Sequence, residues 1–175
     1  RLRAGIHGLI GLTGMTGNAT NHGTMSFWGT LVGTLANDGV VTPGSSFDEG
    51  APTILARIEG VFSQSATGTL EATIGATSGG FVSIAGRADI DGTLRLLRHC
   101  QDMNGCFPVP AAPFSVHVLH ADGGVSGQFA TWTSPGLLIT GNLRYLDSDV
   151  FFDVTSVSAV NDVAPGNAGT AVVPR

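Results

Sequence analysis

The chain has 175 residues, enough for a single domain with a hydrophobic core. Hydrophobic residues make up 42% of it, which argues against disorder from a lack of apolar surface, whereas charged residues make up only 12%. The net charge of −5 argues against binding to nucleic acid or to an anionic membrane, because both attract basic surfaces. Low charge, 26 glycines and many uncharged polar residues favour an exported protein over a cytosolic enzyme.

The first element along the chain is a nine-residue phrase that occurs twice. It reads GNATNHGTM from Gly17 and GTLANDGVV from Gly33. Because Asn and Gly tolerate positive φ, we interpret the phrase as a short strand that leads into a tight turn. The segment GRADIDGTL from Gly86 keeps the same glycine spacing, and longer forms begin at Gly60 and Gly141.

Strands are predicted between these turns. Apolar residues alternate with polar ones in 69–74, 93–97, 114–119, 142–146 and 150–157, which is the two-residue period of a strand. Helix signals are scarce, so the sequence predicts an all-β fold. The residues assigned to structural turns are Gly17, Asn21, Gly23, Gly33, Asn37, Gly39, Pro43, Gly44, Gly60, Gly68, Gly86, Gly92 and Gly141.

The repetition of the glycine phrase favours a parallel β-solenoid. A unit of short strands cannot bury its apolar face alone, and stacking it on its neighbour extends one continuous core. A β-sandwich remains the structural alternative, because it also has several short strands at regular spacing. We predict one solenoid domain over residues 1–157 and a linker or tail over 158–175, within a chain that we interpret as a processed piece of a longer protein.

Residues 98–113 interrupt the predicted stack. They enclose Cys100 and Cys106, whose separation by five residues with an Asn-Gly turn favours a disulfide over a zinc site or reduced thiols. A disulfide implies an oxidising compartment. Insertions of this kind project from one face of a solenoid and often carry its binding activity.

Three segments together resemble a known family. The first segment, residues 37–75, contains Asn37, Gly39, Pro43 and Gly44, followed by the strings FSQ and GTLEATIG. The second, residues 82–97, reads VSIAGRADIDGTLRLL. The third, residues 120–157, contains the strings ADGGVSGQFA and DSDVFFDVT. This combination resembles the passenger-associated transport repeat of bacterial autotransporters and the last turns of their passenger domains.

The resemblance implies a right-handed parallel β-helix that is secreted and displayed on the surface of a Gram-negative bacterium. The membrane barrel of such proteins is expected outside this sequence, and residues near 158–175 would lie close to it. The pair Cys100 and Cys106 departs from the family, whose passengers usually avoid cysteine.

The densest apolar alternation lies near the C-terminus, and in such passengers the last turns are thought to fold first. We therefore expect a folding core formed by Phe114, Val116, Val118, Leu143, Tyr145, Phe151 and Val154. On this expectation a charged residue in place of Phe151 would destabilise the fold by several kcal/mol, since large-to-small changes alone cost about 3–5 kcal/mol.

No catalytic, cofactor or metal constellation is evident in the sequence. His117 and His120 are three residues apart on a predicted strand, which would place them on opposite faces and prevent a shared metal. Calcium could bind to carboxylates of the acidic segments, but the nonapeptide repeat that binds calcium is missing, so turn capping is favoured; the residues are Asp89, Asp91, Asp147, Asp149 and Asp153. No nucleophile elbow, P-loop or dinucleotide fingerprint is present.

These observations predict a non-catalytic structural or adhesive module of the cell surface, without a cofactor, that supports export and folding of a longer passenger. Its ligand would be a host surface or a glycan. One alternative is a subunit that stacks end to end into extracellular oligomers or filaments through the solenoid ends, since open strand edges pair readily. The other, less favoured, is a surface esterase or glycosidase.

Overall fold

The computed structural model describes residues 2–3, 9–11, 15–43, 56–74, 81–98, 100–101, 105–106 and 108–158. Every regular element in these segments is a β-strand, which confirms the predicted all-β class. The predicted turn residue Gly44 lies outside them. So does the proposed tail, apart from its first residue, which ends the last strand.

One sheet consists of six short parallel strands, and we call it the short sheet. Each strand pairs with the next in register, so that Ala19, Leu35 and Phe62 are Cα partners along one column. In sheet order the strands are β1 (Leu2–Arg3), β4 (Ala19–Asn21), β6 (Leu35–Asn37), β9 (Phe62–Gln64), β12 (Ala88–Ile90) and β17 (Val125–Gly127).

The second sheet has two arms that meet at the long strand β5 (Thr24–Val32). The first arm contains β2 (Leu9–Gly11), β7 (Val40–Pro43), β10 (Thr69–Ile74), β13 (Thr93–Arg98) and β18 (Thr131–Thr133). The second arm contains β3 (Met15–Thr16), β8 (Ala56–Ile58), β11 (Val82–Ile84), β16 (Phe114–Ala121), β20 (Asp149–Ser158) and β19 (Leu138–Tyr145).

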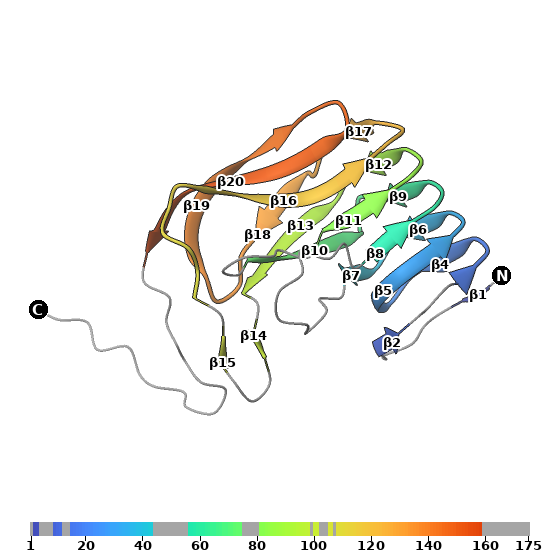
Figure 1. The fold of residues 1–175 in the computed structure, drawn as a ribbon, viewed down its shortest axis with the longest axis horizontal. Helices are drawn as coiled ribbons and strands as arrows, with labels where there is room; N and C mark the ends of the chain where they lie inside the picture. The colour runs from blue at the N-terminus through green and yellow to red at the C-terminus, as the bar shows by residue number, and fades with distance from the viewer. Residues whose placement is uncertain are drawn as a thin grey trace, which may run out of the picture.

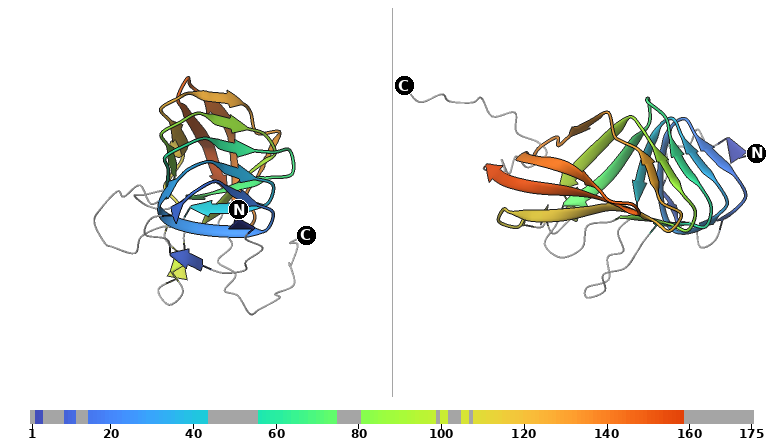
Figure 2. Two further views of the ribbon diagram at one scale, coloured as in Figure 1. Left: turned by 90° about the vertical axis from the view of Figure 1, so that its right-hand side faces the viewer. Right: turned by 90° about the horizontal axis from the view of Figure 1, so that it is seen from above.

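The chain passes through the short sheet, the first arm and the second arm in that order and then repeats the circuit. We call one such circuit a level. For example, β6, β7 and β8 are followed by β9, β10 and β11, each paired in parallel with the strand one level earlier. Figure 1 shows these levels side by side from the N-terminal to the C-terminal end, and Figure 2 shows them along the stack and from above. Parallel pairing of this kind is compatible with a β-helix or solenoid and departs from the antiparallel sheets of a sandwich.

The core lies between the short sheet and the two arms of the second sheet, and it is built from columns of equivalent residues. Met25, Val41, Leu70 and Leu94 are successive neighbours in the first arm, and all are buried. Two further columns run through the other walls, with Ala19, Leu35, Phe62 and Ala88 in the short sheet and Ala56, Val82, Leu119 and Val150 in the second arm. Because apolar and polar residues alternate in register, each inward-facing apolar side chain packs against another apolar side chain one level away.

A column of glycines marks the corner between the second arm and the short sheet. A Cβ added to Gly33, Gly60 or Gly86 would overlap the backbone of the glycine one level earlier. Gly33 also has a φ of 145°, which disfavours other residues. Close backbone approach at this corner thus explains why the phrases at Gly33, Gly60 and Gly86 begin with glycine.

The C-terminal end differs from the rest because β19 and β20 form an antiparallel hairpin that extends the second arm. β20 pairs with β16 and β19 pairs with β20, each with one register shift. The shift between β19 and β20 leaves Thr155 of β20 without a partner opposite Gly141, where a Cβ would overlap Asp153 O and the Phe152 ring. Gly141 therefore lies inside a strand, opposite a bulge in β20, and is not the predicted turn.

Pro43 also differs from its assignment as a turn residue. It is the last residue of β7, it is buried, and it is the register partner of Phe27. The proline ring continues the apolar column of the first arm at this position.

Most of the predicted folding-core residues face inward. Val116, Val118 and Val154 are buried, and Phe114, Leu143 and Tyr145 are partly buried against the core. Phe151 is the exception, because β20 alternates and turns Val150 and Phe152 inward instead. The expectation that Phe151 belongs to the core is wrong.

Candidate functional site

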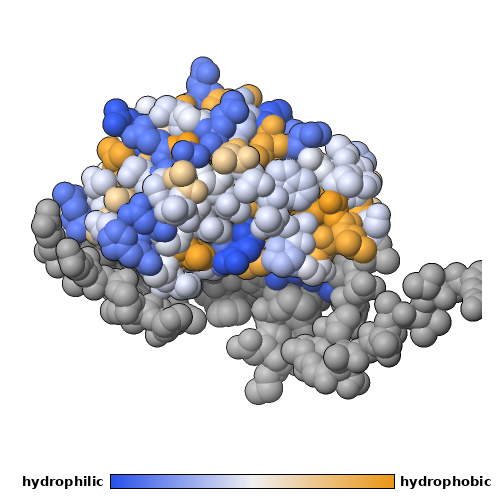
Figure 3. All heavy atoms as spheres, turned by 180° about the vertical axis from the view of Figure 1, so that it is seen from behind, coloured by the Kyte–Doolittle hydropathy of each residue, from blue (hydrophilic) through white to orange (hydrophobic). Residues whose placement is uncertain are grey.

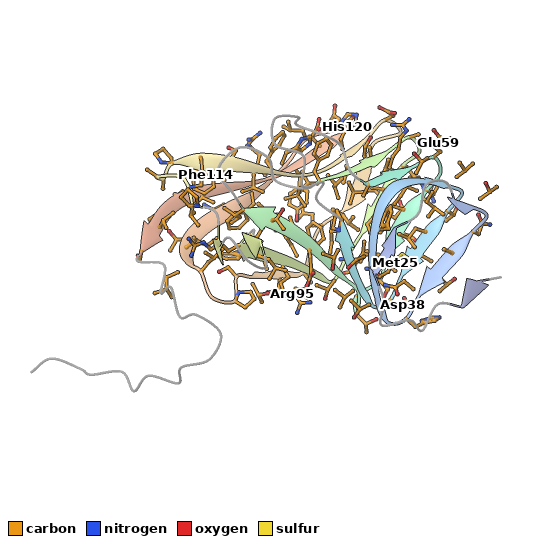
Figure 4. The ribbon with its side chains drawn as sticks, turned by 60° about the horizontal axis from the view of Figure 1, so that its bottom comes forward. Met25, Asp38, Glu59, Arg95, Phe114 and His120 are labelled. Carbon is orange, nitrogen blue, oxygen red and sulfur yellow. The ribbon has the colours of Figure 1, made fainter. Side chains whose placement is uncertain are left out.

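The candidate site is a histidine–carboxylate cluster on the outer face of the second arm. It consists of His117, His120 and Asp122 from β16 and the turn after it, and of Asp149 from the start of β20. Figure 4 places His120 on the same side of the molecule as Glu59, with Arg95 and Asp38 on the opposite side.

Both histidines lie on one face because β16 contains a bulge. The register with β20 shifts between His117 and Leu119, and Val118 and Leu119 are both buried. This extra inward residue returns His120 to the outer face that His117 occupies. The prediction that the two side chains point in opposite directions is wrong, since it assumed an unbroken two-residue period.

One carboxylate oxygen joins the two histidines. Asp149 Oδ1 lies 2.9 Å from His117 Nε2 and 2.8 Å from His120 Nδ1. His120 Nε2 in turn lies 3.0 Å from Asp122 Oδ1. Both ring nitrogens of His120 thus face carboxylate oxygens, which accept hydrogen bonds and cannot donate when ionised.

This arrangement favours the charged forms of the cluster. The hydrogen bond to Asp149, followed by that to Asp122, raises the pKa of His120 above its ordinary 6.5. Burial acts to raise the pKa of Asp149, but the hydrogen bonds with His120 and His117 outweigh it and lower that pKa below 3.8. Both shifts extend the pH range in which His120 is an imidazolium and Asp149 a carboxylate.

An aromatic column runs beside the cluster. The His117 ring stacks between Phe81 and Phe151, with centroid separations of 4.5 and 4.6 Å. The Arg144 guanidinium lies 4.6 Å from the Phe151 ring centroid and donates two hydrogen bonds to Asp153. The outer-facing Phe151 thus holds β16 and β19 together from outside, since its ring is covered on both faces.

The cluster holds no arrangement for nucleophilic catalysis. Ser83 is the register partner of His120, but its hydroxyl accepts a hydrogen bond of 3.2 Å from Arg57 and both nitrogens of His120 face carboxylates. No base is therefore free to activate that hydroxyl. Among the described residues, no group of three His, Cys, Asp or Glu side chains could hold a metal ion.

A second feature is a ladder of buried amides at the corner between the short sheet and the first arm. Asn21 donates to Asn37 Oδ1 at 2.9 Å, and Asn37 donates to Gln64 Oε1 at 3.0 Å. Asn21 and Asn37 also accept hydrogen bonds from the amides of Gly23 and Gly39, which closes each turn. Within the described segments positive φ occurs only at glycine, so these two asparagines do not act through positive φ as predicted.

Gln64 is a site residue that the sequence reading missed. It is 4% exposed, and its amide also donates to Asp91 O at 2.7 Å. Its signal is its place at the end of FSQ, which matches the place of Asn in ATN and LAN. The longer Gln side chain fits the longer turn that follows it.

A shallow groove of about 330 Å³ lies over the short sheet. Its lining includes Asp89, Asp91 and Ser126. Asp89 is already engaged, since it accepts hydrogen bonds from Ser126 at 2.6 Å and from Arg87 at 3.0 Å. Asp91 accepts from the Gly92 amide, as expected of a turn-capping carboxylate.

The two short strands of the predicted insertion lie away from the stack, whereas Val109 and Ala112 near its end pack against the core. Cys100 and Cys106 are Cα partners in the two-residue strands β14 (Cys100–Gln101) and β15 (Gly105–Cys106), which Figure 1 shows below the body of the molecule. Opposite positions in an antiparallel pair are within the range that a disulfide spans. The cysteine side chains lie outside what the structure describes, and the disulfide stays a prediction.

Comparisons with protein-family models and with curated proteins found no match to this chain. Within the described segments, no helix is long and apolar enough to cross a membrane. The resemblance to autotransporter passengers thus rests on its sequence motifs.

Proposed function

We propose that this chain is a non-catalytic structural module: a right-handed parallel β-helix that forms the C-terminal stem of an exported autotransporter passenger. In this role it stands on the outer surface of a Gram-negative cell and supports the export and folding of the segment that precedes it. Adhesion to a host surface or glycan would involve the projecting insertion at 98–113.

The observation that carries this proposal is the constant register of the parallel strands. Apolar columns run through all three walls, and the amide ladder pairs buried polar groups from level to level. A continuous core with paired backbone gives a stiff stalk. The residues with chemistry of their own, His117, His120 and Asp149, are bound to one another and not directed at a reaction site.

The hydropathy of the exposed residues is compatible with such a stem. The face in Figure 3 is mostly hydrophilic or neutral, with hydrophobic residues in separate patches. Among the described residues the exposed large hydrophobic side chains are Val32, Leu138 and Leu146. Separate patches of this kind do not call for a permanent partner.

The test is surface display of a reporter domain fused in front of this chain, which is followed by an outer-membrane anchor. With the intact stem we expect a folded, protease-resistant reporter outside the cell. Deletion of the stem should abolish display of the reporter, and so should Phe152→Asp, because it places a charge at a fully buried position. Asn142→Asp on the exposed side of β19 is the matched control. Equal display without the stem would contradict the proposal, and turnover of ester or glycoside substrates would contradict its non-catalytic part.

End-to-end assembly is a second candidate function, favoured by the strand edges at the C-terminal end. β17 and β18 are the outermost described strands of the short sheet and the first arm, and the antiparallel hairpin extends only the second arm. Open edges of this kind pair with other chains. Sedimentation at rising concentration should then show oligomers that Thr131→Lys and Thr133→Lys abolish, whereas a monomer at all concentrations would exclude this function.

A further inference from the structure

We propose that His117, His120 and Asp149 form a proton-dependent latch that fastens the β19–β20 hairpin to the parallel stack and holds it less tightly once His120 loses a proton. This inference rests on the geometry of the cluster. It does not depend on the proposed function.

The latch lies where the hairpin is joined least regularly. β16 is the last parallel strand of the second arm, and its ladder to β20 is interrupted at Val118. His117 and His120 flank that interruption on one strand. Asp149 of the other strand reaches both of them through a single oxygen, so the cluster bridges the gap that the bulge leaves.

Protonation of His120 decides how strongly the latch holds. Its two nitrogens lie 2.8 and 3.0 Å from oxygens of Asp149 and Asp122, and only the imidazolium donates to both. After loss of one proton, a nitrogen lone pair faces a carboxylate oxygen, and one contact becomes repulsive. A neutral His120 therefore keeps at most one of its two hydrogen bonds.

The directions in which the two pKa values are moved determine the pH range in which the latch is stable. The pKa of His120 is raised, so its contribution is complete below 6.5 and is lost as pH rises through the higher native value. The pKa of Asp149 is lowered, so its contribution is present above 3.8 and is lost only as pH falls through the lower native value. The latch is therefore complete between pH 3.8 and pH 6.5 and loosens as pH rises through the native pKa of His120.

The other charged groups near the latch are paired among themselves. On the hairpin, Arg144 of β19 binds Asp153 of β20, and this pairing lowers the pKa of Asp153. On the stack side, Ser83 of β11 is the register partner of His120 and accepts a hydrogen bond from Arg57 of β8. Arg57 Nε also lies 3.5 Å from Glu59 Oε1. Asp147 precedes β20 in the hairpin turn. His120 is thus the group of the latch that contacts two carboxylates at once.

The experiment combines an NMR titration of the imidazole rings with amide hydrogen exchange of β19 and β20 between about pH 5.5 and pH 8.5. In the wild-type protein we expect a His120 midpoint above 6.5. Protection factors of the hairpin amides, corrected for intrinsic exchange, should fall several-fold above that midpoint, while those of β7 and β10 stay constant.

Two variants separate the latch from a general effect of pH. His120→Gln should remove the pH dependence of hairpin protection, whereas His22→Gln should retain it, because His22 pairs with Asp38 at an exposed corner far along the chain. A His120 midpoint at or below 6.5, or equal pH dependence in wild type and His120→Gln, would overturn the proposal.

If His120→Gln fails to fold, Asp122→Asn provides the test. Asp122 is exposed and contributes only the second carboxylate, so its loss should lower the His120 midpoint and move the fall in protection by the same amount. Unchanged values in that variant would count against the latch.

Discussion

At the scale of single residues, the amide ladder shows how one position in the repeat serves two purposes. The side-chain oxygen of Asn37 accepts from the turn amide of its own level and from Asn21 one level earlier, while its nitrogen donates to Gln64 one level later. The sequence reading identified Asn21 and Asn37 as turn residues. It did not place them inside, because only the stack reveals that each has an equivalent polar neighbour one level away.

Replacement of Asn37 by Ala should therefore destabilise the protein by at least about 2 kcal/mol, since each buried polar group left without a partner costs about 1–3 kcal/mol. Asn37 is 1% exposed, and its removal affects Asn21, Gln64 and Gly39 together. Urea unfolding followed by circular dichroism measures the change. Asn142→Ala, at an exposed position, is the control and should stay within about 0.5 kcal/mol; equal effects at both positions would show that the ladder does not contribute.

At the scale of elements, β20 has one face in the core and one on the surface, and the two neighbouring phenylalanines separate them. Phe152 is fully buried and contacts Trp132 edge to face, while Phe151 stacks on His117 outside. A run of two aromatic residues does not reveal which one faces inward. That choice is set by the register with β16, which the bulge at Val118 determines.

We expect Phe152→Ala to cost about 3–5 kcal/mol, as for other large buried aromatic residues. Phe151→Ala should cost only about 0.5–1.5 kcal/mol, the range of one aromatic stacking interaction. Thermal and urea unfolding of the two variants give the comparison. A larger loss of stability in Phe151→Ala than in Phe152→Ala would contradict the assigned faces.

Strand positions were predictable from the sequence wherever polar and apolar residues alternate without interruption, as in 69–74 and 93–97. The corner glycines were predictable because their spacing repeats. The histidine cluster was not, since it depends on a bulge that no local pattern marks and on a partner strand that comes later in the chain. Backbone irregularities of this kind reflect tertiary pairing and leave little trace in a two-residue period.

At the scale of the whole molecule, each level contacts mainly the levels beside it, so folding can begin at one place and spread. The C-terminal levels carry the antiparallel ladders, which are local in sequence between β19 and β20. Local pairing closes a short loop at low entropic cost. This supports the hypothesis that the segments 114–119 and 142–157 form the folding nucleus.

A matched pair of valine substitutions tests that hypothesis. Val154→Ala should slow refolding, with a φ-value above about 0.5, whereas Val41→Ala should mainly speed unfolding, with a φ-value below about 0.3. Both valines are buried, at 1% and 0% exposure, so their equilibrium effects should be similar. Stopped-flow refolding in urea provides the rates; the reverse order of φ-values would place the nucleus in the N-terminal levels.

The column of glycines at the corner between the second arm and the short sheet determines where such a molecule can gain or lose a level. Gly33, Gly60, Gly86 and Gly123 stand one above another although different numbers of residues separate them along the chain. A duplication or deletion that starts and ends at these glycines would keep every remaining contact in register. The glycines thus divide the chain into units of one level each. Recombination at these positions would give a longer or shorter stem with the same type of core.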